Sequence, residues 1–189
     1  MTRGKPISML FAMLALFACA GTAPAAELPG ASVYRLDIAL IDQDGRGFRL
    51  GERQGKPVLI SMFYTSCQYV CPLIIDSLRK TQAALARDGG ASFDVLLVSF
   101  DPQRDTPARL AQVFAERKLG ANWTLARTDA ASVRKLAAVL DIQYRALANG
   151  DLNHSSSITL LGEDGRLLAR TDKIGEVDAE FVVKVRAAR

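Results

Sequence analysis

Two continuous apolar segments, separated by one amphipathic segment, restrict the fold of this 189-residue chain more than any other feature. Residues 58–64 read VLISMFY, and residues 93–100 read FDVLLVSF. Uninterrupted runs rich in β-branched and aromatic residues are typical of strands that are covered on both faces. Both segments are therefore predicted to be central strands of a sheet.

The segment between these two strands has the periodicity of an α-helix, which Gly89-Gly90 would end. Its apolar residues fall on one side and its charged residues on the other, namely Ile74, Ile75, Leu78 and Leu85 against Asp76, Arg79, Lys80 and Arg87. A strand, a helix and a strand in this order form a right-handed βαβ unit with parallel strands. The carboxyl ends of both strands then lie at the same edge of the sheet.

The flanking segments complete an α/β pattern. Residues 34–41, a turn at Asp44-Gly45 and a return arm at Phe48 and Leu50 predict an N-terminal β-hairpin. Further along, we expect helices that begin near Thr106-Pro107 and Asp129, strands over 142–147, 157–161 and 167–171, and a closing helix over 177–185. This element order predicts a thioredoxin-like fold, with a central mixed sheet flanked by helices and the hairpin as an N-terminal extension.

The first residues have the pattern of an export signal. Arg3 and Lys5 precede an apolar run over 7–20, and an A-x-A pattern follows at 23–25. We expect residues 1–25 to be a signal peptide, 26–33 a linker and 34–189 one domain of an exported, periplasmic protein, soluble or membrane-associated. The apolar run is shorter than the roughly 20 residues of a spanning helix, which leaves a short anchor or a lipid on Cys19 as alternatives.

Charge excludes one class of partner. The net charge is +4, and Arg3 and Lys5 supply two of those positive charges. The small remaining excess predicts no nucleic-acid partner. Contact with a membrane is expected only through the N-terminal anchor or lipid.

Beyond the signal, the chain keeps few soft metal ligands: Cys67, Cys71, Met62 and the single histidine, His154. The two cysteines form a C-x-x-x-C pair between a buried strand and the start of a helix. A helix N-terminus lowers the cost of a thiolate, which metal binding and disulfide exchange both require. Because the residue before a proline avoids helical geometry, Pro72 is expected to leave the pair across a loop and the first helical turn.

His154 lies in a polar segment, 150–155, that is expected to be a loop leading into the strand over 157–161. A single histidine in a loop is usually solvated, but in thioredoxin-like folds this segment faces the cysteine-bearing loop. Two thiolates and one imidazole suit copper. Thiolates select Cu(I), and an added imidazole nitrogen together with an open coordination position on the metal also allows Cu(II) to bind. Zinc normally takes a fourth ligand, and Met62 is more typical of core packing within its strand.

Three segments resemble the Sco/SenC family in the same order. They are Phe63-Tyr64-Thr65-Ser66-Cys67 through Cys71-Pro72, the segment SFDPQRDTP over 99–107, and His154-Ser155 with Asp164-Gly165-Arg166. The resemblance extends from about residue 36 to the C-terminus. It implies a copper metallochaperone that binds copper through Cys67, Cys71 and His154. The implied partner is a copper-accepting oxidase subunit, whose dinuclear copper centre would be metallated, or another periplasmic copper protein.

The same resemblance makes Asp101 a candidate for a residue that contacts the metal ligands without binding the metal itself. In this role it would orient His154 or the cysteine loop. The alternative is that Asp101-Pro102 forms a turn and that Arg104 and Asp105 form a surface pair. The chain also departs from the family, because many members carry acidic residues around the cysteines where this chain has Gln68, Tyr69, Leu73 and Ile74. That difference could change the copper affinity or the partner surface.

Two other functions remain open. In a thiol-disulfide oxidoreductase, Cys67 would attack and Cys71 would resolve the mixed disulfide, and His154 would not be needed. In a redox or copper sensor, the bound metal or the disulfide would change the shape of the loop. A peroxiredoxin-like peroxidase is disfavoured, because Tyr64 replaces the threonine expected three residues before the reactive cysteine.

Overall fold

The computed structural model describes residue 1 and residues 28–87 and 93–188. The predicted export signal, Cys19 and the helix stop at Gly89-Gly90 lie outside these residues. In chain order the elements are η1 (Val33–Arg35), β1 (Ala39–Asp42), β2 (Gly47–Arg49), η2 (Leu50–Arg53), β3 (Val58–Phe63), α1 (Val70–Arg87), β4 (Asp94–Ser99), α2 (Pro107–Glu116), β5 (Trp123–Arg127), α3 (Ala130–Val139), β6 (Tyr144–Ala146), β7 (Leu152–His154), β8 (Ile158–Leu161), β9 (Leu167–Thr171) and α4 (Ala179–Ala187).

The predicted βαβ unit is confirmed at the centre of the fold. β3 and β4 pair in parallel, with Val58 opposite Asp94 and Phe63 opposite Ser99, and α1 connects them. Every residue of β3 is buried, as its uninterrupted apolar run predicts. The strand order is β2-β1-β5-β4-β3-β8-β9, with parallel and antiparallel neighbours. The sheet is therefore mixed and the fold is thioredoxin-like, as predicted.

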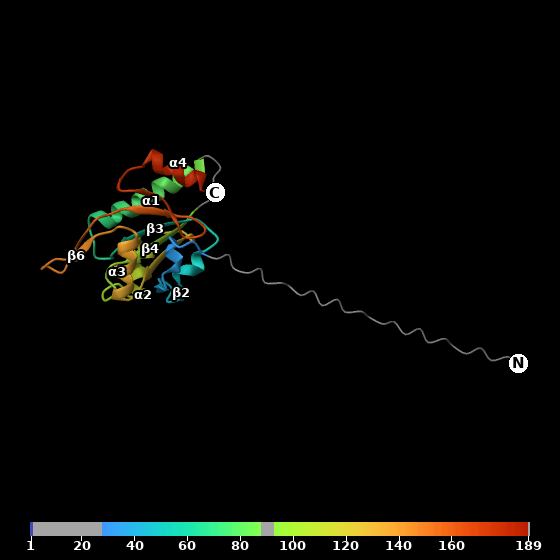
Figure 1. Ribbon diagram of the computed structural model, residues 1–189. Helices are drawn as coiled ribbons and strands as arrows, with labels where there is room; N and C mark the ends of the chain where they lie inside the picture. Colours follow the sequence, from blue (N-terminus) through green and yellow to red (C-terminus); the bar gives the residue numbers. More distant parts are fainter. Residues whose placement is uncertain (2–27, 88–92, 189) are drawn as a thin grey trace.

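The helices form two layers around this sheet. Figure 1 shows α1 and α4 on one side of the sheet and α2 and α3 on the other. The N-caps agree with their residue types, because Thr106 accepts from the amide of Arg109 and Asp129 accepts from the amides of Ala131 and Ser132. Within the described part of the chain, no helix combines the length and the apolar character that a membrane crossing requires.

Three short segments differ from the predictions. The strand expected from residue 34 begins at Ala39, because the Ser32 side chain caps a 3-10 turn, η1, before it. β5 was not predicted, since WTLAR mixes apolar and polar residues; it becomes a strand between β4 and β1, which offer hydrogen-bonding partners on both sides. Residues 152–154, expected in a loop, form β7, which pairs with β6 in a separate two-stranded sheet.

Candidate metal centre

The cysteine pair lies where β3 ends and α1 begins. The amide of Cys67 donates to the carbonyl oxygen of Tyr64 at 3.3 Å, which closes a turn directly before the helix. Cys71 lies in the first turn of α1 and is only 4% exposed, whereas Cys67 precedes the helix. The pair therefore spans a loop and the first helical turn, as predicted, although Cys71 itself adopts helical geometry before Pro72. A proline is tolerated there because the first amides of a helix have no intrahelical acceptor.

The two thiols differ in their proton affinity. Both are free thiols, Cys67 partly exposed and Cys71 buried, and the amide of Cys71 donates to the Sγ atom of Cys67 at 3.4 Å. A hydrogen bond from the Cys71 thiol, helped by the amides of residues 69–71 at the helix start, lowers the pKa of Cys67 to about 4. The same hydrogen bond, together with burial, raises the pKa of Cys71. Cys67 is thus the thiolate and Cys71 the thiol that stabilises it.

His154 is the last residue of β7, where it pairs with Tyr144. Its ring lies 4.9 Å from the ring of Phe100 and 5.8 Å from that of Tyr64, centroid to centroid. Its Nδ1 atom lies 2.9 Å from the carbonyl oxygen of Ser155. Since a carbonyl only accepts hydrogen bonds, Nδ1 is the ring nitrogen that donates in this contact, and Nε2 is the nitrogen that a neutral imidazole offers to a metal ion.

The fold brings these three residues together. One ligand atom each from Cys67, Cys71 and His154 lies within 4.8 Å of the others, which makes this a potential metal-binding group in the described residues. Three ligand atoms spaced evenly around one ion, each about 2.3 Å from it, lie about 4 Å apart, so a shift of less than about 1 Å completes the site. The two sulfurs and one nitrogen are the donor set of a soft metal ion.

A surface pocket of about 520 Å³ opens at this group. It is lined by Cys67 and His154 and by side chains of the cysteine loop and of the turn before β7, among them Gln68, Tyr69, Leu147 and Asp151. Tyr69 is 83% exposed. The thiolate and the imidazole are therefore accessible from outside, while Cys71 lies behind them. Met62, the other soft side chain, is buried within β3.

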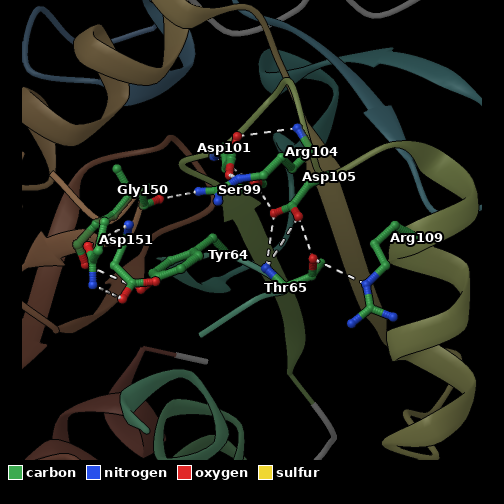
Figure 2. A network of polar contacts seen from close by, with 11 residues as sticks. Tyr64, Thr65, Ser99, Asp101, Arg104, Asp105, Arg109, Gly150 and Asp151 are labelled. Atoms are coloured by element: carbon green, nitrogen blue, oxygen red, sulfur yellow. Dashed lines mark hydrogen bonds and ion pairs between the residues drawn. The ribbon is translucent and has the colours of Figure 1, made fainter. Parts of the chain in front are cut away.

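Asp105 supports the start of the cysteine loop by hydrogen bonding to Thr65, a role that the sequence did not predict. The carboxylate is 1% exposed and accepts hydrogen bonds from the Thr65 amide at 3.1 Å and from the hydroxyls of Thr65 and Ser99. Figure 2 shows this network, with Arg109 donating to the Thr65 hydroxyl. The proposed surface pair of Arg104 and Asp105 is thus wrong. An acidic residue directly before the helix start at Thr106-Pro107 carried no sequence signal for burial.

Asp101 contacts Arg104, and its link to the histidine runs through that residue. The Asp101 carboxylate accepts from the amide and from the Nε of Arg104. The Nη2 atom of Arg104 donates to the carbonyl oxygen of Gly150, at 2.7 Å, in the turn between β6 and β7. The ring nitrogen Nδ1 of His154 contacts Ser155 and Ser156 instead.

Comparison with known proteins identifies related sequences. A family model described as SCO1/SenC matches residues 27–187. The SCO1 protein homolog of Bacillus subtilis is 27% identical over 133 residues, which cover 67% of this chain and 67% of that protein. The chain spans between about half and two thirds of the length of the first curated relatives it matches.

Two solved structures show the same fold. ScoI of Bradyrhizobium japonicum, solved with copper bound, is 24% identical and has a TM-score of 0.62, covering 80% of this chain and 97% of that chain. BsSco, described as a member of the Sco family of cytochrome c oxidase assembly proteins, is 22% identical and has a TM-score of 0.66, covering 79% of this chain and 90% of that chain.

Proposed function

Because this chain belongs to the SCO1/SenC family, we propose that it binds copper through Cys67, Cys71 and His154 and delivers it to a copper-accepting subunit of cytochrome c oxidase. One observation carries the proposal: two sulfurs and one imidazole from distant parts of the chain lie within 4.8 Å of one another. The copper-bound ScoI structure and the description of BsSco as an oxidase assembly protein support the metal and the client.

The protonation of the site suits a metal carrier. Cys67 is a thiolate before the metal arrives, so its sulfur can bind first. Cys71 keeps its proton in the metal-free protein and releases it when copper binds, because only a thiolate is a good ligand. Two thiolates hold Cu(I), and Nε2 of His154 adds the harder donor that Cu(II) prefers.

The pocket supports transfer to a partner. Copper held by Cys67 and His154 would face the opening, with Cys71 at its back. A client could then replace the exposed ligands one at a time without unfolding the chaperone. The predicted export signal at residues 1–25 supports a periplasmic location for this exchange. The client could equally be another periplasmic copper protein.

A thiol-disulfide oxidoreductase is the second candidate, and the asymmetry of the cysteines favours it. An accessible thiolate, Cys67, beside a buried thiol, Cys71, is the arrangement of an attacking and a resolving cysteine. In that function His154 would not affect the rate. A redox or copper sensor would use the same three residues but would need a separate receptor.

Copper titration of the reduced protein under anaerobic conditions, against a competing chelator, tests the proposal. We expect one copper per chain, loss of tight binding in Cys67→Ser, and weaker binding in His154→Ala, with the larger loss for Cu(II). Arg145→Ala is the matched control, because this exposed side chain lies on the partner strand β6 and does not line the pocket. Unchanged affinity for both oxidation states in His154→Ala would rule out the three-ligand site.

A further inference from the structure

The ligands come from two separate supports. Cys67 and Cys71 belong to the junction of β3 and α1, which is part of the main sheet. His154 belongs to the hairpin of β6 and β7, which pair only with each other within the described residues. A two-stranded hairpin alone is marginally stable in water. The position of the imidazole therefore depends on what attaches this hairpin to the domain.

The base of the hairpin is attached by aromatic packing. Tyr144 and His154, opposite each other in the hairpin, both contact Phe100, with ring centroids 5.1 Å and 4.9 Å away. The hydroxyl of Tyr64 also donates to the carbonyl oxygen of Leu152, at 3.3 Å. These contacts hold the strands near the site but do not reach the turn.

The turn is attached by Arg104. The amide of Leu147 donates to the carbonyl of Asp151 at 2.8 Å, and Gly150, with φ of +83°, allows the chain to reverse. The Gly150 carbonyl points at Arg104, which donates to it from Nη2 at 2.7 Å. The side chain of Arg104 is half exposed, but the Asp101 carboxylate holds its Nε and its backbone amide. The contacts with Asp101 thus fix the orientation of the guanidinium that donates to the hairpin.

Arginine is suited to this contact. Its planar guanidinium can donate to a carboxylate and to a carbonyl in different directions at the same time, whereas lysine offers one compact ammonium group. The neighbouring residue, Asp105, binds Thr65 at the start of the cysteine loop. Two adjacent residues of one loop thus contact the two parts of the chain that carry the ligands, the hairpin and the cysteine loop (Figure 2).

We propose that Arg104 is a positioning residue that fixes the hairpin of β6 and β7, so that His154 stays within reach of Cys67 and Cys71. This inference deepens the proposed copper function and, for its effect on copper, rests on it. Arg104 touches neither the ligand atoms nor the metal position. Its effect is therefore exerted only through the histidine-bearing hairpin.

The first test is made without copper, by hydrogen exchange of the metal-free reduced protein. Arg104→Met keeps the aliphatic stem but removes the donors. Since one hydrogen bond contributes about 1 kcal/mol, we expect the amides of 147–154 to exchange about two- to tenfold faster. Arg145→Met is the control. It also removes one positive charge, but from an exposed position of β6, and should leave these exchange rates unchanged. Equal exchange in Arg104→Met and the unmodified protein overturns the proposal.

The second test is a double-mutant cycle of copper affinity. Arg104→Met should weaken copper binding about two- to tenfold, and it should cause no further loss in the His154→Ala background. Arg104→Lys should recover only part of the loss. An equal loss with and without His154 overturns the positioning role. If the unmodified reduced protein binds no copper, the proposed function falls, and the exchange rates still decide whether Arg104 holds the hairpin.

Discussion

The imidazole of His154 rests on the ring of Phe100, with 4.9 Å between their centroids and a tilt of 41°. Phe100 is the residue that directly follows β4, and it is 4% exposed. The residue directly after the second buried strand of the βαβ unit therefore provides the ring against which the histidine packs. For the proposed copper site, we therefore expect copper affinity and core packing to be coupled through this one side chain.

Replacing Phe100 should affect stability and copper binding together. Phe100→Leu keeps an apolar side chain but removes the ring contacts to Tyr144 and His154, at a cost of about 1 kcal/mol in the free energy of unfolding. Copper affinity should fall because the imidazole loses its support. Phe181→Leu, at a buried position of α4, is the control and should lower stability without changing copper affinity. Chemical denaturation and copper titration measure both quantities, and copper affinity unchanged by Phe100→Leu would contradict the coupling.

The alkylation rate of Cys67 should not change with pH between about 6 and 9. Its pKa, lowered from 9.0 to about 4, makes the thiolate fraction nearly complete throughout this range, and only the thiolate reacts. Cys71 should stay unmodified, because it is buried and its pKa is raised. Mass spectrometry of the reduced, metal-free protein after timed iodoacetamide treatment measures both sites.

Cys71→Ala provides the comparison for this pH profile. It removes the thiol hydrogen bond that lowers the pKa of Cys67 most, so the pKa should rise towards its ordinary value. The alkylation rate of Cys67 should then increase with pH across the same range. Two identical profiles would show that the helix start alone, rather than the Cys71 thiol, stabilises the thiolate.

Asp105→Asn should destabilise the domain by about 1–3 kcal/mol, the cost of leaving buried polar groups without a partner. The carboxylate accepts hydrogen bonds from the Thr65 amide and from two hydroxyls, and an amide can accept through only one of its two ends. Asp76→Asn, on the exposed side of α1, should change stability by less than about 0.5 kcal/mol. Urea denaturation compares the two; equal midpoints would mean that the buried network adds no stability.

Gly165→Ala should destabilise the protein more than Gly45→Ala. Both glycines have positive φ, +77° and +78°, which costs an alanine about 1–2 kcal/mol. At Gly165 a Cβ atom would also lie 2.6 Å from the Ser32 hydroxyl and from the Tyr34 ring, whereas at Gly45 it would meet open space. Thermal denaturation should show a larger decrease in Tm for Gly165→Ala. Similar decreases would indicate that Ser32 and Tyr34 move aside at little cost.

Local patterns were sufficient for much of the fold. The apolar runs predicted β3 and β4, the alternation of apolar and charged residues predicted α1, and Thr106 and Asp129 marked two helix starts. These signals depend on residues within one strand or one helical turn, so they can be recognised in the chain alone. For the same reason, the sequence was enough to place the cysteine pair between a buried strand and a helix.

Other features depended on contacts between distant residues. β5 and β7 become strands where β4 and β6 offer them hydrogen-bonding partners, and neither has a continuous apolar run of its own that marks it in the sequence. The burial of Asp105 requires the loop after β4 to pack against Thr65, and no pattern within that loop indicates this contact.

The sequence by itself determined the chemistry available to the candidate site, two thiols and one imidazole, and the strand and helix that present the thiols. Only the tertiary structure decided that the imidazole reaches them, that Cys67 rather than Cys71 is the thiolate, and that Arg104 and Phe100 hold the histidine hairpin. The physical reason is that side-chain identity and periodicity are local properties. Distances and proton affinities, in contrast, depend on which distant groups the folded chain places beside each other.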